Sequence, residues 1–147
     1  MRKIIYTFFL LSLAIFFSCS SKYDQLLDAI EKGDVPKVKQ LIDARIDVNT
    51  KTIYGPNALW IAVFDNQKEI VKLLIRANAD INVKSDHEET PVWIAAYSGF
   101  AEIVKILIDA KADLNIKNKD GKTALTAAKQ KGHEEIVTLL EKSGAKE

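Results

Sequence analysis

Apolar residues recur along most of the chain at spacings of three and four, which is the period of an amphipathic helix. One such face is formed by Ile70, Leu73 and Leu74. It returns after 33 residues, and again after another 33, as Ile103, Ile106 and Leu107 and then as Ile136, Leu139 and Leu140. The pattern predicts one type of helix used several times, with the same face buried each time.

A shorter apolar segment precedes each of these helices and begins at a residue suited to a helix N-terminus. Asn57, Thr90 and Thr123 can accept hydrogen bonds from free backbone N–H groups, and Pro91 fits the first helical position. Small residues occupy the middle of each segment, where a second helix could approach closely; they are Ala62, Ala95 and Ala128. The repeating unit is therefore expected to contain two helices.

Two further positions follow the same period. Asp47-Val48-Asn49 returns as Asp80-Ile81-Asn82 and as Asp113-Leu114-Asn115. Gly144 ends the last helix, where a left-handed residue is favoured, and its equivalents are Arg45, Asn78 and Lys111. Asn tolerates that conformation, whereas Arg45 and Lys111 are expected to cost stability there.

The repeated unit resembles the ankyrin repeat. The resemblance is carried by Thr90-Pro91-Val92-Trp93-Ile94-Ala95-Ala96, Gly99, Glu102-Ile103-Val104, Leu107 and Ala112-Asp113-Leu114-Asn115, and it extends from about Tyr23 to Lys146. It implies an all-α solenoid of four helix-turn-helix repeats joined by hairpin-like loops, at about 23–50, 51–83, 84–116 and 117–147. Trp60, Trp93 and Thr126 stand where the family pattern usually has His, and the two tryptophans are expected to pack under the loops.

The outermost repeats are polar where the inner repeats are apolar, as the ends of a solenoid require. In the first repeat the substituted positions are Asp28, Lys37 and Gln40. In the last repeat they are Lys129 and Glu141. Both ends are expected to be closed to further stacking.

The N-terminus has the order of a secretory signal peptide. The basic residues of Met1-Arg2-Lys3 precede an uncharged apolar run from Ile4 to Phe17, which is shorter than a membrane-spanning helix requires. Residues 1–18 are accordingly predicted to be a signal peptide, and residues 19–22 a short tether before the repeat domain at 23–147.

Phe16-Phe17-Ser18-Cys19 resembles the end of a bacterial lipoprotein signal, although Phe16 and Ser18 depart from the usual residues. The resemblance implies cleavage before Cys19, a diacylglyceryl group on its sulfur and an acyl group such as palmitate on its new amino group. Several acyl chains would anchor the protein stably in a membrane of the bacterial cell envelope, on its periplasmic or outer surface. Ordinary cleavage after Ser20, followed by secretion, is the alternative.

Composition leaves few chemistries open. Lys and Arg number 21 and Asp and Glu 20, so no basic excess favours nucleic acid. One cysteine and two histidines (His87 and His133) cannot build an ordinary structural zinc site. The sequence has neither a Gly-rich phosphate loop nor a nucleophile elbow. We therefore expect no cofactor, no metal and no enzymatic activity.

The resemblance implies that a partner would contact the loop tips and the exposed side of each first helix, which together line a concave groove. Tyr54, Phe64 and Tyr97 are the candidate aromatic anchors because exposed aromatics dominate interface energetics. The full set of candidate partner-binding residues is Ile53, Tyr54, Phe64, Asp65, Asp86, His87, Glu89, Tyr97, Lys119, Lys122 and Lys131.

These features together predict a function in protein binding. The expected protein is a monomeric, envelope-anchored lipoprotein that binds a protein partner through its concave groove. The alternative is a secreted inhibitor or effector that acts on a foreign (host) protein.

Overall fold

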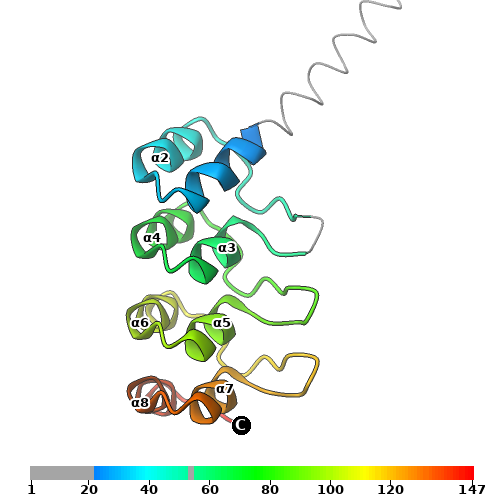
Figure 1. Ribbon diagram of the computed structural model, residues 1–147, viewed down its shortest axis with the longest axis vertical. Helices are drawn as coiled ribbons and strands as arrows, with labels where there is room; N and C mark the ends of the chain where they lie inside the picture. The colour runs from blue at the N-terminus through cyan, green and yellow to red at the C-terminus, as the bar shows by residue number, and fades with distance from the viewer. Residues whose placement is uncertain (1–21, 53–54) are drawn as a thin grey trace, which may run out of the picture.

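The computed structural model describes residues 22–52 and 55–147. Within these ranges, eight helices are stacked in four antiparallel pairs and no strand is present (Figure 1). The pairs are residues 22–31 with α2 (Val35–Asp43), α3 (Ala58–Phe64) with α4 (Lys68–Arg76), α5 (Pro91–Ser98) with α6 (Ala101–Asp109), and α7 (Ala124–Lys131) with α8 (Glu134–Lys142). The first helices of the pairs form an inner row next to the hairpin loops, and the second helices form an outer row (Figure 1).

Side-chain caps begin the inner helices α3, α5 and α7, as the sequence predicts. The side chain of Asn57 accepts a hydrogen bond from the backbone N–H of Trp60 at 3.1 Å. Thr90 and Thr123 accept in the same way from the third residue after each of them, at 3.4 and 3.3 Å. Each cap satisfies an N–H group that the helix itself cannot, which stabilises a helix end by about 1 kcal/mol.

The core is a column of equivalent side chains, one layer per repeat. Leu59, Val92 and Leu125 are all buried at matching positions of α3, α5 and α7. Because α5 packs against both α3 and α7, each inner repeat covers the apolar face that its neighbours cannot cover alone. Burial of one such side chain contributes roughly 1.5–3 kcal/mol, so the stack as a whole provides the fold's stability.

Every left-handed residue of the described chain belongs to one of three sets with a spacing of 33 residues. The helix-ending set is Arg45, Asn78, Lys111 and Gly144, as the sequence predicts. The set between paired helices is Gly33, Asn66, Gly99 and Gly132, and the set at the hairpin tips is Gly55, Glu88 and Gly121. Sequence reasoning missed the last two sets, because Asn66 and Glu88 interrupt their glycines.

The repeated Asp-x-Asn motif joins neighbouring repeats. Each asparagine Oδ1 accepts a hydrogen bond from a backbone N–H of the next repeat, 31 residues further along the chain. The three bonds run from Asp80 to Asn49 (2.7 Å), from Asp113 to Asn82 (2.9 Å) and from Lys146 to Asn115 (2.7 Å). Within each motif the aspartate accepts from the asparagine N–H, which holds the turn in shape.

The C-terminal end of the stack is polar and ion-paired. Lys129 Nζ lies 3.0 Å from a carboxylate oxygen of Glu141 and 2.6 Å from one of Glu147. At the other end, Asp28 and Gln40 are exposed and Lys37 is partly buried. The polar residues predicted to close the array therefore lie on its outer surfaces.

The predictions made for the first 21 residues, including lipidation of Cys19, lie outside the described part of the chain. Within the described part, no helix combines the length and the apolar character that crossing a membrane requires.

Candidate protein-binding surface

Two stacked aromatic pairs lie on the inner-helix face of the molecule. Phe64 stacks on Trp60 with ring centroids 5.5 Å apart, and Tyr97 stacks on Trp93 at 5.0 Å. Within each pair the rings are four residues apart on one helix, so they lie on the same face. Phe64 is 58% exposed and Tyr97 41%, and they are the large apolar side chains of the described chain that remain exposed.

The tryptophans hold these rings in place. Trp60 Nε1 donates a hydrogen bond to the backbone carbonyl of Glu89 at 3.0 Å, and this bond joins α3 to the hairpin loop of the next repeat. Trp93 is buried, and its Nε1 has no hydrogen-bond partner within the described residues. A ring already fixed by stacking loses little freedom on binding, which favours its use in an interface.

A groove of about 600 Å³ surrounds Tyr97. It is defined here as the second groove, and its lining includes Phe64, Glu89, Trp93, Tyr97, Asn118, Lys122 and Lys131. Lys131 Nζ lies 4.2 Å from the centroid of the Tyr97 ring, which is a cation–π contact. Lys122 Nζ donates to Gln130 Oε1 at 3.3 Å. The second groove thus combines aromatic rings with two lysines.

A larger groove of about 1040 Å³ lies over the first two repeats and reaches the hairpin loop of the third. It is defined here as the first groove. Its floor is apolar and consists of Tyr23, Leu27, Ile46, Pro56, Trp60 and Ile61. Its rim carries Asp24, Glu31, Asp47, Asp86 and Glu89, together with Lys51 and His87. Glu89 lines both grooves, so the two form one continuous surface.

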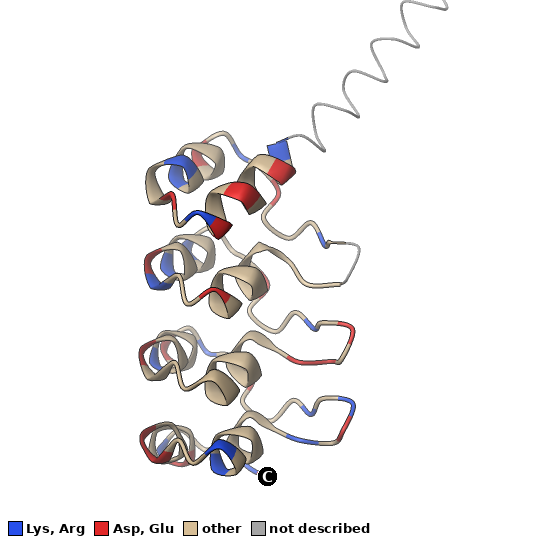
Figure 2. Ribbon diagram, viewed as in Figure 1, with Lys and Arg blue, Asp and Glu red and all other residues tan. Residues whose placement is uncertain are grey.

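Burial is the main cause of the pKa shifts near the first groove, and neighbouring carboxylates add to them. The pKa of Asp65 is raised from its ordinary value, first by burial and second by the charge of Glu31. Burial raises the pKa of Tyr23 to about 12, and the charge of Asp47 acts in the same direction. Tyr23 donates its hydroxyl proton to the backbone carbonyl of Thr50 at 2.5 Å. Figure 2 shows the corresponding acidic residues on the first helix and on the hairpin that precedes α5.

The structure brings most of the predicted partner-binding residues together. Phe64, Tyr97, Lys122 and Lys131 line the second groove, Asp86 and His87 the first, and Glu89 both. Asp65 and Lys119 line neither groove. The backbone N–H of Lys119 instead donates to the carbonyl of His87 at 3.1 Å and ties two hairpin loops together. Ile53 and Tyr54 lie outside the described residues.

Sequence reasoning missed the contribution of the first repeat. Tyr23, Leu27 and Ile46 form part of the floor of the first groove, and Asp24 and Glu31 part of its rim. Among the polar residues of that repeat's helices, only Asp28, Lys37 and Gln40 were interpreted from the sequence, and they were interpreted as an end cap. The available signal was the presence of two carboxylates on the same helix as Leu27, two helical turns apart and therefore on one face.

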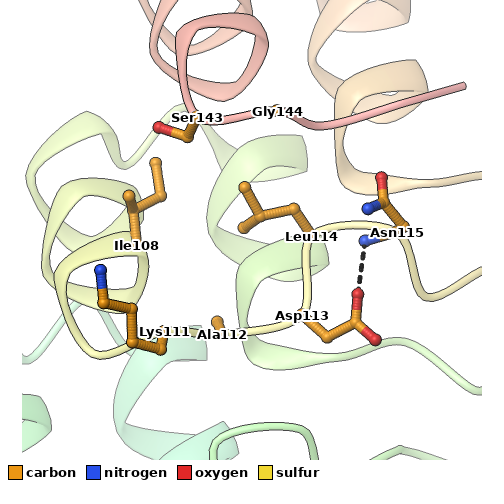
Figure 3. Close-up of a pocket in the computed structure, with 8 residues that line it drawn as sticks. All are labelled: Ile108, Lys111, Ala112, Asp113, Leu114, Asn115, Ser143 and Gly144. Carbon is orange, nitrogen blue, oxygen red and sulfur yellow. Dashed lines mark hydrogen bonds between the residues drawn. The ribbon is translucent and has the colours of Figure 1, made fainter.

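A third pocket, of about 430 Å³, lies near the C-terminus and contains none of the predicted residues (Figure 3). It is lined by Ile108, Lys111, Ala112, Asp113, Leu114, Asn115, Ser143 and Gly144. The backbone N–H of Asn115 donates to Asp113 Oδ1 at 2.9 Å beside it (Figure 3). This pocket follows from the geometry of the left-handed helix ends and the repeated Asp-x-Asn turn.

The described ranges contain no group of three or more His, Cys, Asp or Glu side chains arranged to hold a metal ion. The loop from Asp86 to Glu89 is acidic, but Glu88 is paired with Lys84 at 2.8 Å and Glu89 is hydrogen-bonded to Ser85.

A stack of paired helices with an exposed aromatic surface defines a solenoid protein of the kind that serves as an interaction module. A family model described as ankyrin repeats (three copies) matches residues 26–118 and, in an overlapping match, residues 65–147. The chain belongs to the ankyrin-repeat family, whose members are typically non-enzymatic protein-interaction modules. The chain matches no curated protein.

Proposed function

We propose that this protein is an envelope-anchored lipoprotein that binds a protein partner through its inner-helix face. The single observation that carries the binding surface is the pair of stacked, exposed aromatics: Phe64 on Trp60 and Tyr97 on Trp93. Aromatic side chains supply large contact area at low entropic cost and are enriched among the residues that dominate binding energy.

The two grooves support the same surface. They continue into one another at Glu89 and place the aromatic rings between an acidic region and two lysines. A protein partner can cover such an extended surface, whereas a small ligand would need a more enclosed cavity. The partner is accordingly expected to span at least the second and third repeats.

Affinity capture from the native envelope tests the binding surface. The double variant Phe64→Ala with Tyr97→Ala is expected to reduce capture of the partner more than tenfold, because each interface anchor contributes about 2 kcal/mol or more. The matched control is Lys105→Ala with Glu135→Ala, at two exposed positions of α6 and α8 in the outer row. Circular dichroism should show both variants folded. Equal capture of every partner by the aromatic variant would refute the surface.

The anchor is the second part of the proposal and rests on the sequence around Cys19. Detergent phase partitioning and mass spectrometry of the mature N-terminus test it directly. The expected result is a detergent-phase protein with a triacylated Cys19, and a Cys19→Ala variant that fails to mature. An unmodified chain that begins at Ser21 and stays in the aqueous phase would refute the anchor and favour the secreted inhibitor or effector.

A further inference from the structure

We infer that the first groove binds a basic, apolar segment of the partner, in which Lys or Arg residues flank two or more apolar side chains. The inference rests on the proposed function, since it requires a protein partner, and it adds the chemistry by which that partner is recognised. Three observations carry it: the apolar floor of the groove, the excess of carboxylates on its rim, and the absence of ion pairs at those carboxylates.

The floor of the first groove requires apolar side chains. Leu27, Ile46 and Ile61 are partly buried apolar residues at the edge of the core, and their remaining exposed area faces the groove. Trp60, held by its bond to Glu89, adds an aromatic wall. At about 1040 Å³, the groove is at the upper end of the size of a ligand site, which is enough for several side chains of a peptide.

The rim requires positive charge. Five carboxylates line it, against one lysine: Asp24, Glu31, Asp47, Asp86 and Glu89 against Lys51. Side chains with opposite charge would lower the repulsion among these carboxylates and increase the association rate by electrostatic steering. An acidic or purely apolar segment would leave the five charges uncompensated.

The rim carboxylates are not neutralised by lysines of the described chain. Six carboxylates elsewhere are ion-paired with a lysine, namely Asp28, Glu69, Glu88, Glu102, Glu141 and Glu147. Among the described residues, none of the five rim carboxylates forms an ion pair. Asp24 and Glu31 accept no side-chain hydrogen bond either, so both remain available to a partner within the described structure.

Charge also argues against other occupants. A symmetric dimer through this groove would place one acidic rim against another, and like charges in such a contact are unfavourable. Nucleic acids and anionic lipid surfaces would be repelled in the same way. A separate protein segment rich in Lys or Arg is the occupant that the described surface favours.

Fluorescence anisotropy with two synthetic peptides tests this chemistry. One peptide alternates Leu with Lys and the other alternates Leu with Glu, so that only the charge differs. The protein is used as cells produce and process it, in mild detergent. We expect the Leu-Lys peptide to bind at least tenfold more tightly than the Leu-Glu peptide, with an affinity that falls as salt is raised.

The variant Asp24→Asn with Glu31→Gln should weaken Leu-Lys binding about threefold to tenfold, because it removes two rim charges and no internal contact. The control Asp109→Asn with Glu135→Gln makes the same change in net charge at exposed positions of α6 and α8. It should leave binding unchanged. An equal effect of both variants would show a general charge effect and overturn the inference.

A second copy as the occupant would give a different result. A concentration-dependent dimer in sedimentation experiments that Asp24→Asn with Glu31→Gln disrupts would identify a second copy. This result overturns the inference.

The results that would refute the proposed function differ from those that would refute this inference. If the native partner depends on Phe64 and Tyr97 for capture but is insensitive to Asp24→Asn with Glu31→Gln and to salt, the chemistry of the first groove is wrong and the binding function stands. If no partner depends on Phe64 and Tyr97, the binding surface itself is wrong.

Discussion

Asn82 accepts, through its Oδ1, a hydrogen bond from the backbone N–H of Asp113 at 2.9 Å, and this bond crosses the junction between two repeats. The same bond joins Asn49 to Asp80 and Asn115 to Lys146. In a solenoid, stability is the sum of the repeats' own stabilities and of the interfaces between neighbours. These asparagines therefore contribute to the stability of the interfaces between repeats. Their side chains are polar because they pair with backbone groups.

Replacement of Asn82 by Ala should destabilise the protein by about 1 kcal/mol. The substitution leaves the N–H of Asp113 without its protein acceptor. Because the site is exposed, water compensates for part of the loss, and the cost stays at about 1 kcal/mol. Urea denaturation followed by circular dichroism measures the change as a lower midpoint. The unfolding transition should also broaden, because the second and third repeats are coupled less strongly.

Asn115→Ala is the matched control. Its acceptor serves Lys146, which follows α8 and leads into no further described helix, so its loss frees only residues that follow α8. We expect a change below about 0.5 kcal/mol. Equal destabilisation by the two substitutions would show that the bond has no particular role at internal junctions.

The repeat architecture could be predicted because its signals are local. A helical period of apolar residues, an N-cap and a helix-ending left-handed position each involve residues close together in the sequence, and their recurrence at 33 residues reveals the stack. The Asn82–Asp113 bond was not predicted, although its motif was recognised. A motif that pairs with a backbone group 31 residues away carries no sign of its partner in the sequence.

Lys111→Gly should stabilise the protein by about 0.5–1 kcal/mol. Lys111 follows the last turn of α6 and has a φ of 65°. This conformation is unfavourable for a residue with a Cβ but is open to Gly, as at the equivalent Gly144. The greater freedom of Gly in the unfolded chain offsets part of the gain. Thermal unfolding measures the difference.

Lys105→Gly serves as the control for this prediction. Lys105 lies exposed within α6, where glycine lowers helix stability by about 1 kcal/mol. The two substitutions make the same chemical change and should have opposite signs. A loss of stability in Lys111→Gly would contradict the view that the left-handed lysine is strained.

Tyr23 should make stability depend on pH in the alkaline range. Its pKa rises from 10.0 to about 12 in the folded protein, chiefly because of burial. Between these values the unfolded chain loses the phenolic proton while the native protein keeps it. The free energy of unfolding therefore falls as pH rises from about 10 to 12, by about 2 kcal/mol in total, and this contribution is fully present below pH 10.

The variant Tyr23→Phe isolates this effect. It cannot ionise at that position, so its stability should decline less between pH 10 and 12 than that of the unaltered protein, even though it also loses the bond to Thr50. Urea midpoints of both proteins across this range provide the measurement. Parallel decline of the two curves would show that other groups account for the alkaline loss.

The binding surface could be predicted only in part. Phe64 and Tyr97 were identified because the repeat pattern predicts which positions of an inner helix face outward. The first groove was not identified as a unit, since Tyr23, Ile46 and Trp60 come from separate segments that only the fold brings together. Whether its rim carboxylates form ion pairs likewise depends on which side chains the fold brings close together.

The polar C-terminal end of the stack should act as a barrier to end-to-end association. Lys129 and Glu141 occupy the positions that are apolar in the inner repeats, and in the structure they pair with each other at 3.0 Å. Lys129→Val with Glu141→Ile would restore an apolar surface like that which each inner repeat presents to its neighbour. We expect the variant to self-associate at micromolar concentrations, as sedimentation velocity would show, because an unpaired apolar repeat face seeks a partner surface.

Loss of the ion pair alone should have little effect, because an exposed pair contributes about 0–1 kcal/mol. Lys129→Gln with Glu141→Gln removes both charges but stays polar, and it should remain a monomer. Lys142→Ile adds one apolar residue to α8 at a position that is polar in the inner repeats, as Arg76 and Asp109 show, and should also remain a monomer. If either control associates, then charge loss or general hydrophobicity drives assembly, and not the restored repeat face. If Lys129→Val with Glu141→Ile remains a monomer, the end of the array is closed by something other than these two side chains.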